Sequence, residues 1–578
     1  MDRKTAFLYP CDMSSDHFSQ EIAPGQPGIR APARGLGRGA GPWVLGAALI
    51  AALVLAPILS VLVLASGADP EIWPRLWAGP LPRYLGNTAF IAAGVGLGTA
   101  VMGTIPAWLV AVHDFPGRRV LEWALLMPLA IPAYVGAYAL VDFLEYAGPV
   151  QSGLRAAFGW ARPGDYWFPE IRSRGFAALV LAAALYPYVY LLARAALREQ
   201  PGGAFEVARA LGAGPGRVFL RVGLPLVRPA VAAGAAIAMM ESVADFGVVD
   251  YFGVQTLTTG IFSTWLEMGD AAGAAQIATL ILVAVALLAG AEKAGRARAR
   301  HYHSARHPRP LVRQRLRGPA AAVAAGLCAL PVALGFVLPV GVIGAQALAH
   351  PEAWFGPGLA RALWHTVATG GLAATAAMAG AIFMVYGMRI GGFAALRGLG
   401  LLTTLGYAAP GAVLAVGILI PLARLDHGLA DLIEGLSGHD PGLLLTGSAF
   451  AIVLAFVVRF FAIAQGAVDG AFGRISPSLP MAARALGQGP GGVLRRVHMP
   501  LMAGSVGSGL LLVFVDCVKE LPATLLLRPF NYETLATRMH EKASLEKLGE
   551  AAPAALLVMA VGLAAAALLA RMNLRERG

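Results

Sequence analysis

The sequence predicts an all-α polytopic membrane protein, and three observations support that fold class. Of the 578 residues, 57% are hydrophobic and 13% are charged, about half the charged share of an ordinary soluble chain. About twelve stretches are apolar over the roughly 20 residues that a helix needs to cross a bilayer. One long segment recurs later in the chain. This composition excludes a soluble multidomain enzyme, and it excludes a disordered chain because disorder requires low hydrophobicity.

The expected spans divide evenly between two halves of the chain. In the first half they lie near 42–67, 88–112, 120–142, 175–197, 226–249 and 274–291. In the second half they lie near 319–346, 363–385, 397–421, 444–466, 501–518 and 552–571. We expect Pro128, Pro132 and Pro410 to kink or interrupt the spans that contain them, since proline removes a helical hydrogen bond.

Four regions follow from this pattern. Residues 1–41 are polar and rich in proline and glycine, without the apolar run of a signal peptide, so we expect a disordered cytoplasmic tail. Residues 42–291 form a first transmembrane domain and residues 319–578 a second. The segment 292–318 between them is a basic linker.

The distribution of basic residues predicts that both termini are cytoplasmic, because short cytoplasmic loops are enriched in lysine and arginine. The linker, the segment before the first span and the C-terminus are all rich in arginine. The acidic segment 422–442 is then an external loop. A second external loop is an exception, since it carries Arg155, Arg162, Arg172 and Arg174.

An internal repeat identifies the chain as a duplication. The sequence EVARALGAGPGRVFLRVGLPL from Glu206 matches MAARALGQGPGGVLRRVHMPL from Met481 at an offset of 275 residues. Looser matches pair Asn87-Thr88 with His365-Thr366, and Thr256-Leu257 with Thr534-Leu535. The repeat follows the fourth span of each half, which places it in the cytoplasm. We expect a short helix stopped by glycine, then a second amphipathic stretch closed by proline where the chain enters the membrane. Such an exposed pair of helices is a docking surface.

These repeats resemble the signature loop of type I ABC importer permeases, whose short helix seats in a groove of the ATPase subunit. In the first copy the matching residues are Glu206, Ala208, Gly212, Val222, Leu224 and Pro225. In the second copy they are Ala482, Ala483, Gly487, Val497 and Pro500. Met481 replaces the glutamate and Met499 the leucine, so the resemblance implies two docking contacts that are not equivalent.

The chain past residue 42 is most similar to the permeases of ferric-iron ABC importers, in which two such domains are fused. The segments ESVADFGVVDYFGVQTLTTGIF from Glu241 and DCVKELPATLLLRPFNYETLAT from Asp516 carry this similarity. It implies type I cores near 84–290 and 361–570 and a multi-pass inner-membrane location. Its implied partners are two ATPase subunits and a periplasmic substrate-binding protein. Fused permeases for thiamine or aminoethylphosphonate are built alike, so these cargoes remain open alternatives.

Four carboxylates are candidates for the translocation path. The offset of 275 relates Glu241 to Asp516 and Asp245 to Glu520, so each half is expected to carry two acids one helical turn apart in its fifth span. Acids inside a membrane are costly and usually functional, and oxygen ligands suit a ferric ion. The alternative is that they pair with bases such as Lys519 or Arg528 and pin helix ends. We expect no tight metal site, because a conduit must release what it admits.

Other signals point away from catalysis. No lysine follows a glycine, so the chain lacks a Walker A sequence and its ATPase is expected to be a separate polypeptide. We expect no cofactor, no catalytic residues and no nucleic-acid partner; His301, His303 and His307 suit a basic loop near anionic lipid. An ion-gradient secondary transporter also shows repeats and buried acids, but it has no ATPase to dock. A channel or scaffold would need no soluble receptor.

Overall fold

The computed structural model describes residues 41–67, 72–199, 203–299, 313–392, 394–404, 406 and 409–575. The expected tail and much of the basic linker, including its three histidines, lie outside these residues. Within the described part, strands are confined to β1 (His113–Asp114) and β2 (Gln314–Arg315), which pair in parallel. The prediction of an all-α protein is confirmed.

The first half contains the following helices. They are α1 (Gly41–Ser66), α2 (Ile72–Ala78), α3 (Leu81–Val112), α4 (Arg118–Ala124), η1 (Met127–Ala130), α5 (Ala133–Leu144), α6 (Pro149–Phe158), η2 (Pro163–Asp165), α7 (Arg174–Glu199), α8 (Gly203–Ala210), α9 (Pro215–Val218), η3 (Phe219–Gly223), α10 (Leu224–Ala244), α11 (Gly247–Tyr251), α12 (Leu257–Phe262), η4 (Ser263–Glu267) and α13 (Ala271–Ala299).

The second half repeats this order. Its helices are α14 (Pro319–Val332), η6 (Ala333–Val337), α15 (Leu338–Ala349), η7 (Pro351–Phe355), α16 (Leu359–Gly391), α17 (Ala394–Thr403), α18 (Gly411–Ser437), α19 (Phe450–Gly473), α20 (Ser478–Ala485), α21 (Pro490–Val493), η9 (Leu494–His498), α22 (Met499–Val518), α23 (Pro522–Leu527), α24 (Leu535–Ser544) and α25 (Leu548–Arg575).

The number of spans agrees with the prediction of about twelve. Among the described residues, eleven helices are long and apolar enough to cross a membrane. The pair Arg118–Ala130 and Ala133–Phe158, bent by 97°, makes a twelfth if it is one span. The break falls at Pro132, and Pro410 precedes the start of α18 in the same way. The expected interruption by proline is therefore confirmed.

One predicted loop is wrong. The expected span 397–421 is interrupted between α17 and α18, as its proline predicts, but the expected loop 422–442 is helical as far as Ser437. The proline before α18 sets its start, while Gly438 with a φ of +70° ends it. Leucines spaced along 422–436 supply the apolar face that keeps this acidic segment helical.

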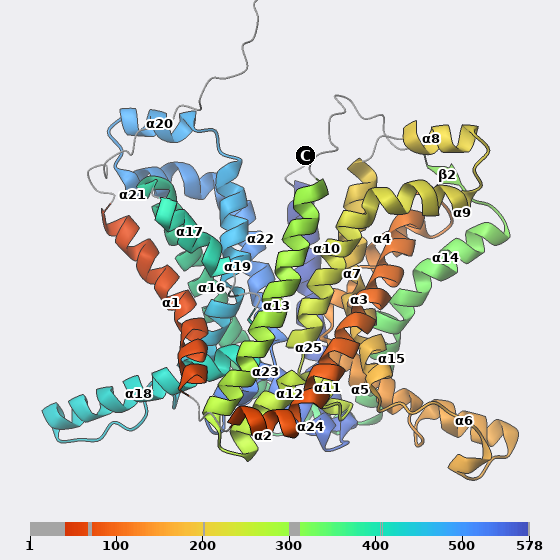
Figure 1. Ribbon diagram of the computed structural model, residues 1–578, viewed down its shortest axis with the longest axis horizontal. Helices are drawn as coiled ribbons and strands as arrows, with labels where there is room; N and C mark the ends of the chain where they lie inside the picture. The colour runs from red at the N-terminus through yellow and green to blue at the C-terminus, as the bar shows by residue number, and fades with distance from the viewer. Residues whose placement is uncertain are drawn as a thin grey trace, which may run out of the picture.

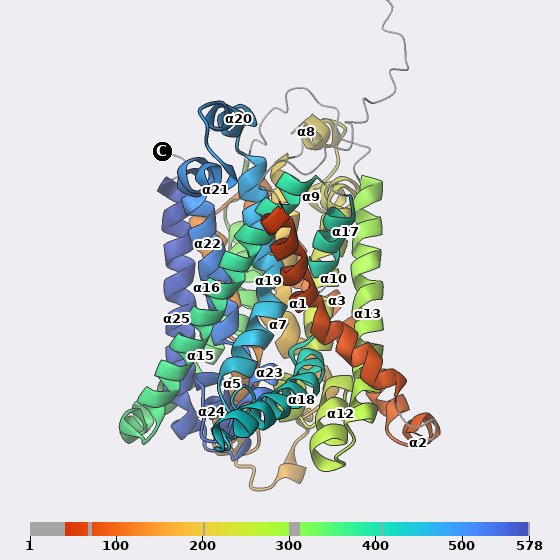
Figure 2. The ribbon, with the colours of Figure 1, turned by 90° about the vertical axis from the view of Figure 1, so that its left-hand side faces the viewer.

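Each half forms a bundle, and the first helices exchange partners between bundles. In the first half α3 packs along α7 and α10, and in the second half α16 packs along α19 and α22. However, α1 packs on α16, α18 and α19 as well as on α13 of its own half, whereas α14 packs on α3, α4 and α7. Figure 2 shows α1 running diagonally across the helices of the second half. The two halves are therefore interlocked.

Hydrogen bonds repeat between the halves at an offset of 278. The Thr88 hydroxyl accepts from the backbone N–H of Leu257 at 3.1 Å, and the Thr366 hydroxyl accepts from that of Leu535 at 2.8 Å. These four residues belong to the looser matches in the sequence. Those matches thus mark the hydrogen bonds that join α3 to the start of α12 and α16 to the start of α24.

The basic segments gather at one end of the molecule. Figure 1 shows α8, α20, the C-terminal end of α25 and the start of α14 at the top, while α6, α12 and α24 lie at the bottom. Three of the exceptional arginines, at the bottom end, are paired or packed. Arg172 contacts Glu145 at 2.7 Å, Arg155 lies 3.9 Å from the ring centre of Tyr146, and Arg174 lies 4.4 Å from that of Phe90.

Candidate docking loops and translocation pocket

The two copies of the repeat have the same backbone. In the first, Gly212 N–H donates to Arg209 O at 2.9 Å and Ala213 N–H to Ala208 O at 3.1 Å. In the second, the corresponding bonds from Gly487 and Gln488 measure 3.0 Å each. This pair of bonds is the Schellman motif, which ends a helix with a left-handed residue. The predicted helix stop is therefore present in both copies.

Glycine is required at this stop because of its backbone conformation. Gly212 has a φ of +80° and Gly487 a φ of +79°. A side chain in that region costs about 1–2 kcal/mol. A Cβ at either position would meet no other atom within 4 Å, so the requirement comes from the backbone alone.

The loops present apolar side chains at the tip of the molecule. Leu211 is 82% exposed and its counterpart Leu486 is 83% exposed. Val207 in α8 and Met481 in α20 are also exposed. Glu206 is exposed beside Val207, and Met481 stands in its place in the second copy. Exposed apolar side chains grouped in this way are typical of a surface that a partner protein covers.

Aromatic packing supports the first loop. The ring of Trp108 at the end of α3 lies 5.4 Å from Phe205 and 5.3 Å from Phe219, measured between ring centres. A Cβ at Gly223 would overlap the Trp108 ring. His113 packs against the same tryptophan, 6.1 Å away. Burial, together with the nearby Arg209, lowers the pKa of His113 from 6.5 to about 4.

The second loop is supported by different side chains. Tyr386 occupies the position of Trp108 at the offset of 278, and its hydroxyl donates to Pro490 O at 2.5 Å. His498 replaces Gly223 and lies 5.6 Å from Tyr386 and 4.8 Å from Phe472, between ring centres. The second loop is thus supported by a hydrogen bond and a histidine ring, whereas the first loop is supported by the packing of the Trp108 indole.

The second part of each repeat differs from the prediction. The expected separate amphipathic stretch is instead the beginning of the spanning helix, continuous from Pro215 to Ala244 and from Pro490 to Val518. Pro225 and Pro500 do not close it. Each follows a π-helical turn, η3 or η9, which widens the helix where proline lacks an N–H and its ring would clash with the preceding turn.

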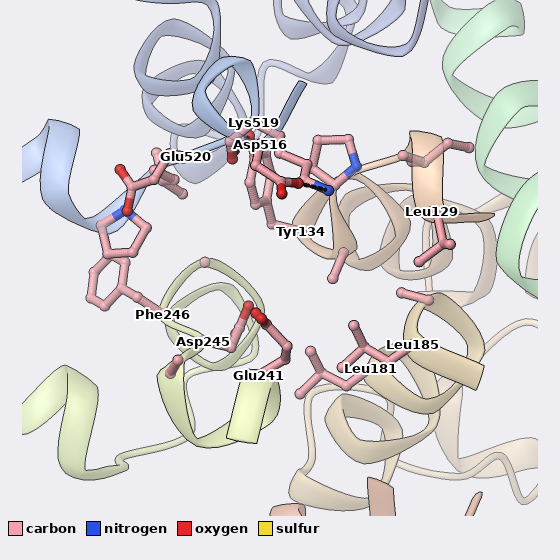
Figure 3. A pocket seen from close by; sticks show the side chains of 18 of the residues that line it. Leu129, Tyr134, Leu181, Leu185, Glu241, Asp245, Phe246, Asp516, Lys519 and Glu520 are labelled. Atoms are coloured by element: carbon pink, nitrogen blue, oxygen red, sulfur yellow. Dashed lines mark hydrogen bonds and ion pairs between the residues drawn. The ribbon is translucent and has the colours of Figure 1, made fainter. Parts of the chain in front are cut away.

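The four candidate acids line one pocket, which has a cavity volume of about 140 Å³. Figure 3 shows Glu241 and Asp245 on one side, Asp516, Lys519 and Glu520 across from them, and Tyr134 nearby. The pocket lies at the ends of α10 and α22 that point away from α8 and α20 (Figure 1). The tertiary structure therefore brings together residues that are 275 positions apart.

The second acid of each pair does not lie on the fifth helix, contrary to the prediction. Asp245 follows the last residue of α10, and Glu520 lies two residues past the end of α22. Asp245 accepts from Val248 N–H at 3.0 Å, and Glu520 accepts from Ala523 N–H at 3.1 Å. Each acid thereby caps the short helix that follows, α11 or α23. Asp245 has an extended backbone, with a φ of −69° and a ψ of 140°, which ends α10.

Both acids of the second half pair with a base. Lys519 Nζ lies 2.7 Å from Asp516 Oδ1, and Arg459 lies 2.7 Å from Glu520 Oε1. Arg528, the other predicted partner, pairs with Glu541 outside the pocket. The acids of the second half therefore both line the pocket and pair with bases, so the two roles considered from the sequence occur together.

The corresponding positions of the first half carry no base. Subtracting 275 from Arg459 and Lys519 gives Ala184 and Ala244, and both alanines line the pocket. The lining contains four carboxylates against two basic side chains, so acids are in excess on the side of the first half. In the described part of the chain, no three His, Cys, Asp or Glu side chains converge to hold a metal ion. The described pocket residues can therefore attract a cation by their negative charge, but they do not form a set of metal ligands.

Sequence reasoning missed three of these residues. Arg459 stands alone in the apolar run AIVLAFVVRFFAIAQG, and an intramembrane arginine is itself a functional signal. Trp108 and Tyr386 are matched by the offset of 278, but a tryptophan in an apolar helix gives no sign of what it supports.

Comparisons with known proteins agree with this geometry. Residues 99–291 match the family described as binding-protein-dependent transport system inner membrane component. The Fe(3+)-transport system permease protein FbpB 2 of Haemophilus influenzae is 23% identical over 83% of this chain and 88% of its own length. The molybdenum transport system permease protein ModB of Escherichia coli is 30% identical over 33% of this chain and 83% of its own length. The sulfate transport system permease protein CysT of Synechocystis is 27% identical over 36% of this chain and 70% of its own length.

Proposed function

Because the chain belongs to the family of binding-protein-dependent transport system inner membrane components, we propose that it is a permease that carries ferric iron across the inner membrane. The observation that favours this cargo is the excess of acids in the pocket, four carboxylates against two bases. A negative pocket attracts cations and repels sulfate, the anion in the name of another relative. A relative that matches along most of the chain is named for Fe(3+).

The size of the pocket also favours a small ion. Its volume of about 140 Å³ is below the roughly 300–1,000 Å³ of pockets that enclose organic ligands. Thiamine, a larger cation, is the main alternative cargo, and an organophosphonate is disfavoured by its negative charge. We treat iron as the transported substrate, attracted by hard oxygen groups and released because no complete ligand set surrounds it.

The proposed mechanism is alternating access driven from outside the chain. Two ATPase subunits grip the loops at Gly212 and Gly487, where Leu211 and Leu486 are exposed. Their closure on ATP tilts the two interlocked halves and turns the pocket toward the binding protein. ATP hydrolysis by those subunits returns the pocket to the cytoplasm. In this proposal the end bearing α8 and α20 is cytoplasmic, as are both termini, which the gathering of arginines at that end supports.

Uptake of radiolabelled ferric iron tests the cargo. Cells with the gene deleted should lose uptake and recover it when the gene is restored, while thiamine uptake, measured in parallel, should not change. Loss of thiamine uptake with normal iron uptake would reject iron as the cargo, but it would leave the assignment as an importer permease in place.

Substitutions can separate the acid that only faces the cavity from the acids that also bond to the following helix. Glu241→Gln is expected to reduce iron uptake at least tenfold, because its carboxylate faces the cavity without capping a helix. Asp245→Asn and Glu520→Gln should instead lower the amount of folded protein, because these acids cap α11 and α23. Immunoblotting of membrane fractions separates the two effects. Normal uptake by Glu241→Gln at normal abundance would contradict a role in the path.

A further inference from the structure

We propose that the pocket between the β1–β2 pair and the start of α14 binds a phospholipid with a net negative headgroup. The headgroup phosphate lies against Arg315 and Arg317, and the acyl chains run along the outer face of α14. This lipid pocket is separate from the acidic pocket, because it lies at the end of the molecule that carries α8 and α20. The proposal therefore holds whichever cargo the chain carries.

The lipid pocket has the size and the position that a headgroup requires. Its cavity volume is about 650 Å³, within the roughly 300–1,000 Å³ of pockets that enclose organic ligands. A helix long and apolar enough to cross the membrane begins at Pro319, so the residues directly before it lie at the level of the headgroups. Figure 1 shows α14 at the outer edge of the bundle. A lipid can therefore reach the pocket from the bilayer.

The local backbone presents two arginines to the pocket. Arg315 ends β2, and the backbone N–H of the next residue, Leu316, donates to Asp114 O at 2.8 Å. Arg315 and Arg317 are exposed and line the pocket, whereas Leu316 between them is half-buried and packs on the core of the first half. This alternation is typical of an extended chain. The pairing of β2 with β1 thus holds both guanidinium groups where a phosphate can reach them.

The remainder of the lining suits acyl chains. Ala321, Ala322 and Ala325 line the pocket from the first two turns of α14. Gly326 and Ala329 continue the face of Ala322 and Ala325 at helical spacing, and both are exposed. Small side chains let a straight apolar chain approach the helix closely. A charged group next to such a face matches the two ends of a phospholipid.

The acids near the lipid pocket are already neutralised by other arginines. Asp114, the carboxylate of the lining, lies 3.3 Å from Arg118. Glu122 pairs with Arg118 at 2.9 Å, with Arg198 at 2.6 Å and also with Arg194. Three arginines therefore surround two carboxylates, and the two arginines of the pocket add to this positive charge. Basic pockets of this kind at the membrane surface select anionic over neutral headgroups.

The matching positions of the second half carry different residues. At the offset of 278, Leu396 stands in the place of Arg118 and Gly400 in the place of Glu122. At the offset of 275, Asp469 stands in the place of Arg194. The basic surroundings of the lipid pocket are thus a property of the first half. We therefore expect one selectively bound anionic lipid per chain.

Native mass spectrometry of the purified full chain tests the site. The probe is dioleoylphosphatidylglycerol, and dioleoylphosphatidylethanolamine, with the same acyl chains and no net charge, is the comparison. The wild type should bind one phosphatidylglycerol about tenfold more tightly than phosphatidylethanolamine. Arg315→Gln together with Arg317→Gln should abolish this preference, and the corresponding pair of lysine substitutions should keep most of it. An unchanged preference in the glutamine pair overturns the proposal.

Two further variants distinguish a pocket from a generally basic surface. Ala322→Trp keeps every charge but fills the apolar part of the pocket, so it should weaken phosphatidylglycerol binding about tenfold. The matched control removes two exposed arginines outside the pocket, Arg228 near the start of α10 and Arg474 after the end of α19. This pair, changed to glutamine, should bind phosphatidylglycerol as the wild type does. Equal losses in the control and in the pocket variants would assign the binding to surface charge and reject the pocket.

Competition and thermal unfolding complete the test. Excess inorganic phosphate should not displace phosphatidylglycerol, because the phosphate ion lacks the acyl contacts with α14; displacement would show that the pocket binds the anion alone and would reject the lipid. Phosphatidylglycerol should raise the midpoint of thermal unfolding of the wild type, since a ligand that binds the folded state stabilises it. It should raise that of the glutamine pair less. Equal rises in both proteins would contradict the site.

Discussion

The two docking regions have the same backbone and different supports. Both end their short helix with a left-handed glycine and the same pair of hydrogen bonds. Behind the first region lie Trp108 and a glycine that makes room for it, while behind the second lie Tyr386 and His498. The comparison teaches that the two halves present the same backbone shape to a partner but support it with different side chains.

The largest expected effect comes from removing the shared feature. Replacing Gly212 and Gly487 together by valine should abolish uptake, because a β-branched residue cannot hold a φ near +80° and the helix end must rearrange. The protein should still insert, since a Cβ there meets no other atom within 4 Å. Replacing both by asparagine, which tolerates this conformation, is the control and should keep most activity. Normal uptake by the valine pair would remove the docking assignment.

A smaller effect should distinguish the two supports. Trp108→Ala removes a buried indole, and such changes cost about 3–5 kcal/mol. Tyr386→Phe removes one hydrogen bond to Pro490 O, worth about 1 kcal/mol. Limited trypsin digestion can follow each loop, because Arg209 and Arg484 are equivalent residues 275 positions apart. Trp108→Ala should speed cleavage at Arg209 and leave Arg484 unaffected. Equal acceleration at both sites would mean that the loops are not supported separately.

The smallest effect is a pH dependence of stability to which His113, beneath the first region, contributes. His113 has a pKa of about 4 there, below its ordinary value of 6.5, because it is buried and lies near Arg209. Its contribution to stability is therefore complete above pH 6.5 and is lost as the pH falls toward 4, at most about 1.4 kcal/mol per pH unit. The second half has Gly391 at the corresponding position. Thermal unfolding between pH 7 and pH 5 should show this loss in the wild type and less of it in His113→Gln. An identical loss in both would assign it to other groups.

Much of the architecture could be predicted because it depends on local composition. Apolar runs identified the spans, prolines located the breaks before α5 and α18, and glycine spacing located both docking loops. The same logic failed for 422–437, because an amphipathic acidic segment reads as a loop when its apolar face is not considered.

The sequence by itself determined the duplication, the helix stops at Gly212 and Gly487, and the four acids at matched positions, because each depends on residue type and spacing. Only the tertiary structure decided that α1 packs on the opposite half and that Asp245 and Glu520 cap helices. It also decided that Lys519 pairs with Asp516 rather than with the adjacent Glu520, which is held by Arg459 from α19. These contacts depend on which helices pack together and on the direction in which a turn points a side chain. Residue spacing along the chain predicts neither.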